Sequence, residues 1–431
     1  MKRLTATLLA LAMIIACMLT GCSNKPASDS QQPAPSQTTG EETPAPGGET
    51  GDNVLSFGLI CQFSNGIGLG MYNSLVSWVD HVNKNGGVDI GGTAYTLNMI
   101  AYDSDGNADT AQAGVEKLIY EDKVDYIISD TNMVDPWLHT CEENQVVTFA
   151  ETASSDIYAN DWQYVYEVGA KNAMAAAMNS WYFTAHPEAK TVVSIHPDSA
   201  SGETDGQLFV NIMAALWPEV EVVSIGYPAD STDLSAVATK VVQLNPDVFV
   251  PVGGGPNAIG NACKSVRQAG YEGDMFSTSP FAAKLMLNFI DAADAEGFIN
   301  CALPTEFAEP LTDLAKEFKQ AYIDYYGEWD SPEVVSSTSF FALIGALQQA
   351  GTTDKDAVRE VLNNGMVWDT PVGTYKMVAR GDFGQTRTCD SISDYYMKTM
   401  VNGEATLIDG GYLDIDFVQA AFEVYVGSLE H

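Results

Sequence analysis

Residues 54–70 read VLSFGLICQFSNGIGLG, and this stretch decides the class of fold. Its first eight residues, 54–61, form a continuous apolar run with the length of a buried strand. A glycine-rich turn leads into residues 70–85, where apolar residues recur on one helix face: Leu75, Val76, Val79 and Val82. A buried strand followed by an amphipathic helix predicts a parallel sheet that helices cover on both faces.

The alternation of strand and helix repeats along most of the chain. Further strands are predicted at residues 96–102, which alternate, at 124–129, which are buried, and at 145–150, 191–196, 220–227, 247–252 and 275–279. Helices are predicted from Asp109, which can cap a helix, and at residues 135–144, 172–186, 204–216, 232–244, 256–269 and 282–290. At least eight strands before residue 280 are too many for one small sheet. We therefore predict an α/β fold of two doubly wound parallel-sheet lobes, and the pattern alone leaves a single barrel open.

The first 22 residues predict a leader that is not part of this fold. Lys2 and Arg3 precede the apolar residues 4–19, and the run ends in Leu-Thr-Gly-Cys, with the cysteine at position 22. This pattern resembles a bacterial lipoprotein signal peptide over residues 1–21, with Cys22 as the lipidated residue. A transmembrane helix is the alternative, but the run is short and lacks a basic flank on its far side. Residues 22–52 are rich in Pro, Ser, Thr and Gly, and we expect them to be a disordered tether to the membrane.

Composition and motifs exclude several classes of function. The chain of 431 residues has a formal net charge of −37, so the phosphates of a nucleic acid would be repelled. No phosphate-binding P-loop, HExxH, GxSxG or CxxC motif is present, and the cysteines beyond residue 22 are far apart. We therefore expect no enzymatic activity, no cofactor and no metal. The alternative of a hydrolase lacks any nucleophile and base at a readable spacing.

Eight segments, in order, resemble the Leu/Ile/Val-binding family, the type I solute-binding proteins of ABC importers. They are residues 54–70, HVNKNGGV at 81–88, GGTAYTLNMIAYDSDGNADTA at 91–111, VDYIIS at 124–129, VVTFAETAS at 146–154, VVSIHPDSASGETDG at 192–206, STDLSAVATKVVQLNPDVFVPVGGG at 231–255 and AADAEGFINCALP at 292–304. The resemblance covers about residues 53–388.

This resemblance implies two lobes that close on a ligand through a hinge of three crossovers. The crossovers are expected near Glu167, Ala302 and Trp368. Lobe 1 then comprises residues 53–167 and 302–368, and lobe 2 comprises residues 168–301 and 369–431. The implied protein is a monomeric, lipid-anchored extracytoplasmic receptor that captures a small polar ligand and delivers it to permease subunits with cytoplasmic ATPases. A sensor subunit that signals through a partner is the alternative.

The ligand site is expected at the carboxyl ends of the parallel strands, where open α/β sheets bind ligands. By position, the hydroxyls and amides with which the family holds a carboxylate fall at residues 131–132 and 152–154. Free backbone N–H groups there suit an anion. The predicted ligand-binding residues are Phe63, Ser64, Asp130, Thr131, Asn132, Glu151, Thr152, Ala153, Ser154, Ser201, Gly254 and Ser279.

Two departures from the family bear on the ligand. Amino-acid receptors of the family have an acid in lobe 2 for the ligand's ammonium, whereas this chain has Ser277-Thr278-Ser279-Pro280. Near Ser201 a common aromatic residue is also replaced. Asp130 and Glu151 lie instead at strand ends of lobe 1, where either can meet a cation, cap a helix or form a salt bridge.

We predict that Glu151 accepts the ligand's ammonium, and the alternative is a cap or a pair with Lys171. The aromatic residues Phe63, Trp137 and Phe281 either line an apolar pocket or pack in the core. The leading ligand is an amino acid, with the branched-chain amino acids among the candidates, followed by an aromatic carboxylate or a small amide.

Overall fold

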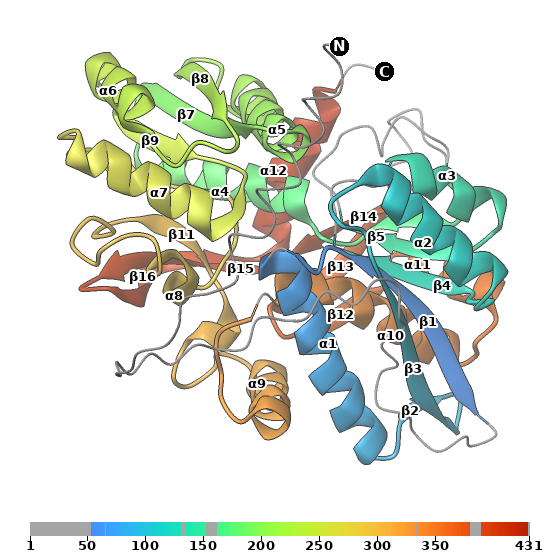
Figure 1. Ribbon diagram of the computed structural model, residues 1–431. Helices are drawn as coiled ribbons and strands as arrows, with labels where there is room; N and C mark the ends of the chain where they lie inside the picture. Colours follow the sequence, from blue (N-terminus) through green and yellow to red (C-terminus); the bar gives the residue numbers. More distant parts are fainter. Residues whose placement is uncertain are drawn as a thin grey trace, which may run out of the picture. The chain divides into compact units, whose positions relative to one another are not determined.

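A six-stranded sheet with the order β2-β3-β1-β4-β5-β6 forms the first part of the fold (Figure 1). The computed structural model describes residues 53–64, 66–130, 135–151, 162–332, 334–379 and 389–429, all within the unit that spans residues 44–431. The strands of the first sheet are β1 (Val54–Cys61), β2 (Val88–Ile90), β3 (Thr93–Asp103), β4 (Tyr126–Ser129), β5 (Val147–Ala150) and β6 (Val165–Glu167). All pairs are parallel except the pair of β2 with β3.

Alternation along β1 directs its side chains to two cores. Phe57 and Leu59 pack with α1 (Gly66–Lys84) and α10 (Thr338–Ala350). Ile60 packs on the other side, with α2 (Ala108–Tyr120) and α3 (Asp135–Glu143). Both faces of the sheet are therefore covered, which explains why its inner strands β4 and β5 are buried along their whole length.

The second sheet is parallel throughout and has the order β10-β9-β7-β8. Its strands are β7 (Thr191–Asp198), β8 (Glu221–Pro228), β9 (Val248–Pro251) and β10 (Asp274–Met275). The core on one face includes residues of α6 (Ser235–Leu244) and α7 (Gly255–Gln268). On the other face the core includes α4 (Lys171–Ala185) and α5 (Ala200–Leu216). Two separate open sheets exclude the single barrel, and the predicted α/β class with parallel sheets is confirmed.

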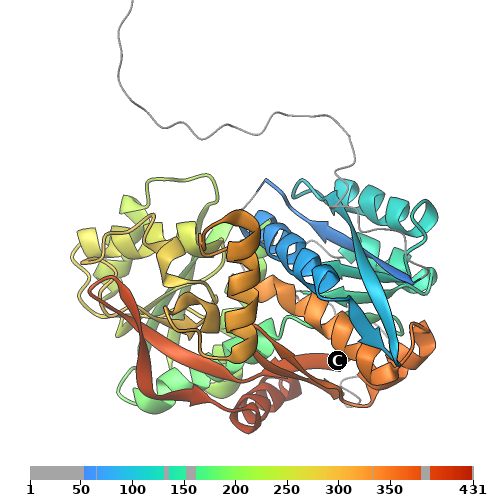
Figure 2. The same ribbon diagram turned by 90° about the horizontal axis from the view of Figure 1, so that it is seen from below.

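The C-terminal part of the chain adds two three-stranded antiparallel sheets, β11-β15-β16 and β12-β13-β14. Figure 2 shows the long strands and the last helix, in red, together on one side of the body. The elements are β11 (Ile299–Ala302), β12 (Val367–Thr370), β13 (Gly373–Ala379), β14 (Cys389–Ser393), β15 (Tyr395–Val401), β16 (Glu404–Leu413), α8 (Ala283–Met286), α9 (Asp313–Tyr326), α11 (Lys355–Asn363), α12 (Ile415–Gly427) and the 3-10 turns η2 (Pro304–Glu306) and η3 (Val335–Ser337).

A buried ion pair fastens the antiparallel strands to the turn after β11. The Lys398 Nζ atom on β15 lies 2.8 and 2.9 Å from the two carboxylate oxygens of Glu306, and it donates to the carbonyl of Phe281 at 2.6 Å. The lysine side chain is 1% exposed and the glutamate side chain 4%. Glu306 also accepts the backbone N–H groups of Leu303 and Ala283. Every oxygen of this buried carboxylate therefore has donors, as a buried charge requires.

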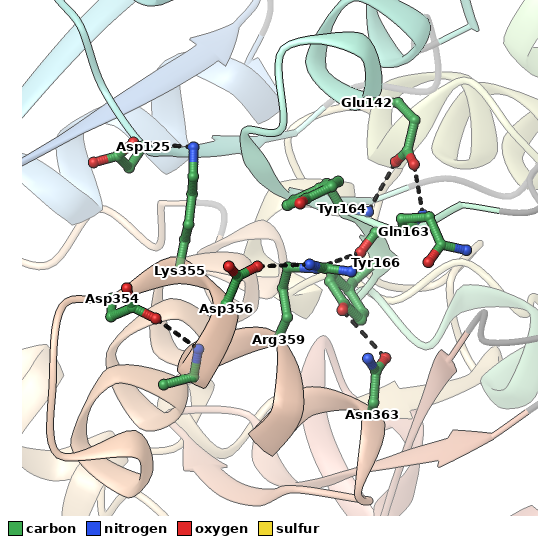
Figure 3. A network of polar contacts seen from close by, with 11 residues as sticks. Asp125, Glu142, Gln163, Tyr164, Tyr166, Asp354, Lys355, Asp356, Arg359 and Asn363 are labelled. Atoms are coloured by element: carbon green, nitrogen blue, oxygen red, sulfur yellow. Dashed lines mark hydrogen bonds and ion pairs between the residues drawn. The ribbon is translucent and has the colours of Figure 1, made fainter.

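Helix α11 is held against the first sheet by a polar network (Figure 3). The Arg359 guanidinium lies 3.8 Å above the ring of Tyr164 and donates to the Gln163 carbonyl at 2.6 Å. Glu142 accepts the backbone N–H groups of Gln163 and Tyr164, both at 2.8 Å. Asp354 caps the helix by accepting the N–H of Ala357. The residues that lead into β6 are thus fixed from two sides.

Several predicted elements differ in detail from those observed. Asn107, and not Asp109, caps α2: it is extended (φ −126°) and its side chain accepts the N–H groups of Asp109 and Thr110. The short strand β2 was not predicted, and Gly91-Gly92 with positive φ forms the turn that pairs it with β3. The strand predicted at 275–279 ends at Met275, because the chain turns to pair Phe276 with Ile299.

Candidate functional site

The carboxyl ends of β4 and β5 bring two acids to the same edge of the first sheet. β4 ends at Ser129 and β5 at Ala150, so Asp130 and Glu151 are the next residues of each strand. The strands pair with Ile128 opposite Phe149, a register that sets Asp130 opposite Glu151. Both side chains are buried, with 7% of Asp130 and 1% of Glu151 exposed. A buried acid needs a hydrogen-bond donor or a cation as its partner, and these two acids have different partners.

Glu151 forms an ion pair with Lys171 in the first turn of α4, with 3.2 Å between Oε1 and Nζ. This is the pairing that the sequence left open as the alternative. The other oxygen, Oε2, is buried and has no hydrogen-bond partner within the part of the chain that the structure describes. A Cβ at Gly169 would lie 2.3 Å from Cγ of Glu151, so this close approach of the backbone needs glycine.

Asp130 faces the turn between β1 and α1. Its carboxylate accepts a hydrogen bond from the backbone of Gln62, and a Cβ at Gly68 would lie 2.5 Å from Oδ2. Oδ1 is buried, and no described residue donates a hydrogen bond to it. Burial, followed by the charge of Glu151, raises the pKa of Asp130 to about 7, against the opposing effects of Gln62 and Lys171. Asp130 therefore titrates near neutral pH instead of staying fully ionised.

A helix that packs on the second sheet, α5, carries an acid that the sequence analysis missed. Asp205 lies on α5, and burial raises its pKa to about 6, while Lys171 and His196 act to lower it. Lys171 thus interacts with acids from both sheets. Nothing in the local sequence distinguishes Asp205 from an exposed helix acid, because its environment depends on how α5 packs near α4.

Three glycines after β9 allow the carboxyl end of the second sheet to lie close to the first turn of α1. Gly253, Gly254 and Gly255 have φ values near +70° at the start of α7, where residues with a side chain are strained. A Cβ at Gly254 would meet Pro197, and one at Gly255 would lie 3.4 Å from Cδ1 of Ile67 in the first turn of α1. The turn after β9 therefore lies against the start of α1 from the first sheet.

The structure locates other predicted residues near these strand ends. Phe63 is half-buried, packs against Tyr72 with 4.8 Å between ring centroids, and donates its N–H to Asp103. Ser64 is exposed and accepts a hydrogen bond from Gln62. Ser279 is partly exposed, and its carbonyl accepts from Asn300 at 2.8 Å.

Other predicted positions lie in the core or outside the described residues. Trp137 is fully buried, and Phe281 is 5% exposed and stacks with Phe298, so both pack in the core. Ser201 lies in the first turn of α5, and its side chain is not described. The predicted residues outside the described part of the chain are Cys22, Thr131, Asn132, Thr152, Ala153 and Ser154.

Two further findings concern the described residues only. Within these ranges, no helix has both the length and the hydropathy needed to cross a bilayer. In the same ranges, no three His, Cys, Asp or Glu side chains are placed to hold a metal ion. The chemistry visible at the strand ends is that of carboxylates, one ammonium and backbone amides, which suits the binding of a polar molecule.

Comparison with known proteins identifies a family. A sequence profile described as periplasmic binding protein matches residues 63–396. No curated protein sequence matches the chain significantly.

Solved structures with similar folds include receptors for different solutes. A leucine binding protein from Thermotoga maritima has a TM-score of 0.65 at 17% identity, over 84% of this chain and 99% of that chain. An ABC-transporter solute binding protein from R. palustris, in complex with benzoate, has a TM-score of 0.65 at 15% identity, over 84% and 96%. A branched-chain amino acid transporter substrate binding protein from Streptococcus pneumoniae, in complex with isoleucine, has a TM-score of 0.62 at 16% identity, over 83% and 100%. At such identities the similarity establishes the fold and not the ligand.

Proposed function

Because this chain belongs to the periplasmic binding protein family, we propose that it is the solute-binding receptor of an ABC importer. Family membership implies an extracytoplasmic location. In the proposed role the protein captures a small polar organic solute between the carboxyl ends of its two parallel sheets and delivers it to permease subunits. We further propose that the boundaries of the two lobes are those expected from the sequence, with crossovers near Glu167, Ala302 and Trp368, and that Cys22 carries the lipid anchor.

The observation that carries the choice of solute is the charge at the strand ends. Lys171 forms an ion pair with Glu151 and interacts electrostatically with Asp130 and Asp205, so carboxylates outnumber the ammonium there. An excess of negative charge in a buried setting disfavours a simple anion and favours a solute with a positive group. An amino acid fits this balance, with its carboxylate held by backbone N–H groups. An aromatic carboxylate such as benzoate fits it less well.

A thermal-shift screen tests the function directly. The panel contains the twenty amino acids, benzoate and benzamide, each at millimolar concentration. A solute at 100 times its Kd stabilises the native state by about 2.7 kcal/mol, enough for a shift of several degrees. We expect at least one amino acid to raise the melting temperature. A flat response across the panel would contradict a receptor for this class of solute.

A further inference from the structure

Asp130 and Glu151 each use one carboxylate oxygen to hold the fold, and among the described residues no donor reaches the other oxygen. On Asp130 the bond from Gln62 leaves Oδ1 unpaired, and on Glu151 the pair with Lys171 leaves Oε2 unpaired. Both unpaired oxygens are buried, in side chains that are at least nine-tenths covered. Buried carboxylate oxygens without donors are unfavourable and are uncommon in native proteins. Two such oxygens at adjacent strand ends indicate a binding site for a ligand group that donates hydrogen bonds.

The strand register places these two residues together. Ile128 of β4 pairs with Phe149 of β5, and two residues further along each strand are Asp130 and Glu151. The charge of Glu151 acts on the carboxyl of Asp130, as expected for close neighbours. A single positively charged nitrogen with several N–H groups can therefore face both carboxylates at once.

The excess of negative charge around Asp130 and Glu151 also favours binding of a cation. Lys171 pairs with Glu151 and also acts on Asp130 and on Asp205 of α5. One ammonium therefore serves three carboxyl groups. A second positive charge would favour the ionised form of Asp130 and lower the cost of burying these acids.

We propose that Asp130 and Glu151 together bind a positively charged nitrogen of the solute, so that the solute is a zwitterion or a cation and not a simple carboxylate. This inference rests on the proposed function, because it names the chemical class that the receptor takes. Asp130 is the residue that selects this class, since Glu151 is already neutralised in part by Lys171. The positive group of the solute is thus held from the first sheet.

A series of solutes that share one side chain separates the headgroups. Phenylalanine carries both charges, 2-phenylethylamine only the ammonium, and 3-phenylpropanoate only the carboxylate. Leucine, 3-methylbutylamine and 4-methylpentanoate form a second such set. We expect the zwitterion of at least one set to bind, and the matching carboxylate to bind at least tenfold more weakly, as measured by calorimetry at pH 7.5. Equal or tighter binding of the carboxylate would overturn this inference while leaving the receptor function intact. If no solute of either set or of the thermal-shift panel binds, the receptor function proposed above fails, and the inference fails with it.

Substitutions test the assignment to Asp130 and Glu151. Asp130→Asn and Glu151→Gln keep the shape of each side chain and remove its charge. We expect Asp130→Asn to weaken binding of the zwitterion by about 10- to 100-fold, and Glu151→Gln to weaken it by about tenfold. Asp125→Asn, at the opposite end of β4 and exposed, and Glu143→Gln, exposed at the end of α3, are the matched controls. An affinity equal to that of the controls in both variants would overturn the assignment.

The pH dependence of binding provides a test that needs no substitution. The groups that interact with Asp130 are Cys61 of β1, Glu151 after β5 and Lys171 of α4, with Asp103 acting on Cys61 and Asp205 interacting with Lys171. A bound cation favours ionised Asp130, so binding below neutral pH releases a proton. Affinity for the zwitterion should therefore be constant above about pH 7.5 and fall by up to tenfold per pH unit below pH 7. An affinity that is unchanged between pH 5.5 and 8 would contradict the role of Asp130, even if the Asp130→Asn variant failed to fold.

Discussion

The Nζ atom of Lys171 lies 3.2 Å from Oε1 of Glu151, and this ion pair joins the end of β5 to the first turn of α4. It links the last strands of the first sheet to the helix that begins the second half of the fold. The glutamate is 1% exposed, whereas a quarter of the lysine side chain is exposed. The lysine therefore supplies the charge that allows a fully buried carboxylate at this point.

Removal of this lysine should destabilise the protein. Lys171→Met leaves Glu151 buried without its cation, and we expect the free energy of unfolding to fall by about 2–3 kcal/mol, reduced from the value for fully buried pairs because Lys171 is partly exposed. Lys355→Met is the control, because its partner Asp125, at 3.5 Å, has a side chain that is 61% exposed, so the pair should be worth less than about 1 kcal/mol. Urea unfolding monitored by fluorescence measures both. Equal losses in the two variants would contradict a structural role for the buried pair.

The raised pKa of Asp130 predicts how stability without ligand depends on pH. In the unfolded chain this carboxyl ionises near pH 4, whereas in the folded protein its pKa is about 7. Between these values the folded state binds the extra proton, so this group makes the protein less stable as pH rises from 4 to 7. Asp130→Asn removes this contribution. We expect the variant to gain on the order of 2 kcal/mol relative to wild type between pH 5 and pH 8. A difference between the two proteins that does not change with pH would show that Asp130 titrates normally.

The buried pair of Lys398 and Glu306 should be more important for stability than any surface pair. Both side chains are almost fully covered, and the lysine also holds the carbonyl of Phe281. Lys398→Met leaves a buried carboxylate, and we expect a loss of about 3–5 kcal/mol in the free energy of unfolding. Lys240→Met on the exposed face of α6 serves as the control and should change stability by less than about 0.5 kcal/mol. A loss below 1 kcal/mol for Lys398→Met would contradict the ion pair.

The lipid anchor stays a prediction from the sequence, because residues 1–52 lie outside the described part of the chain. The basis is the Leu-Thr-Gly-Cys sequence behind a short apolar run. Cys22→Ala should abolish acylation and release the receptor from the membrane fraction, since a lipidated cysteine with several acyl chains anchors stably. Labelling with a fatty-acid analogue and membrane fractionation measure the two effects. Acylation that persists in the variant would mean that the anchor lies elsewhere.

The sequence predicted the parallel architecture well because each buried strand is a continuous apolar run. Val54–Cys61 has the bounds predicted for it, and Val115, Leu118 and Ile119 of α2 are buried as their spacing indicated. Helix α1 begins at Gly66, four residues before the predicted start at 70, because Ile67 and Leu69 in its first turn are exposed and its buried large apolar residues begin only at Met71. The antiparallel strands from residue 299 onward have no such pattern, because buried and exposed residues are interspersed along strands such as β12 and β16.

The candidate site was predictable only where a residue ends a strand. Asp130 and Glu151 follow apolar strands directly, so their place at one edge could be inferred from the sequence. The sequence could not show that each carboxylate has a partner for only one of its oxygens, because those partners, Gln62 and Lys171, come from other parts of the fold. Asp205 was missed for the same reason: its interaction with Lys171 arises from the packing of two helices.

We propose that the two parallel sheets close on a bound solute, and small-angle X-ray scattering tests this closure most directly. The measurement compares the protein alone with the protein saturated by the amino acid that gives the largest thermal shift. Since closing a hinge around a solute brings the two halves together and excludes water, we predict a smaller radius of gyration for the saturated protein. A radius of gyration that is unchanged at saturation would contradict the account.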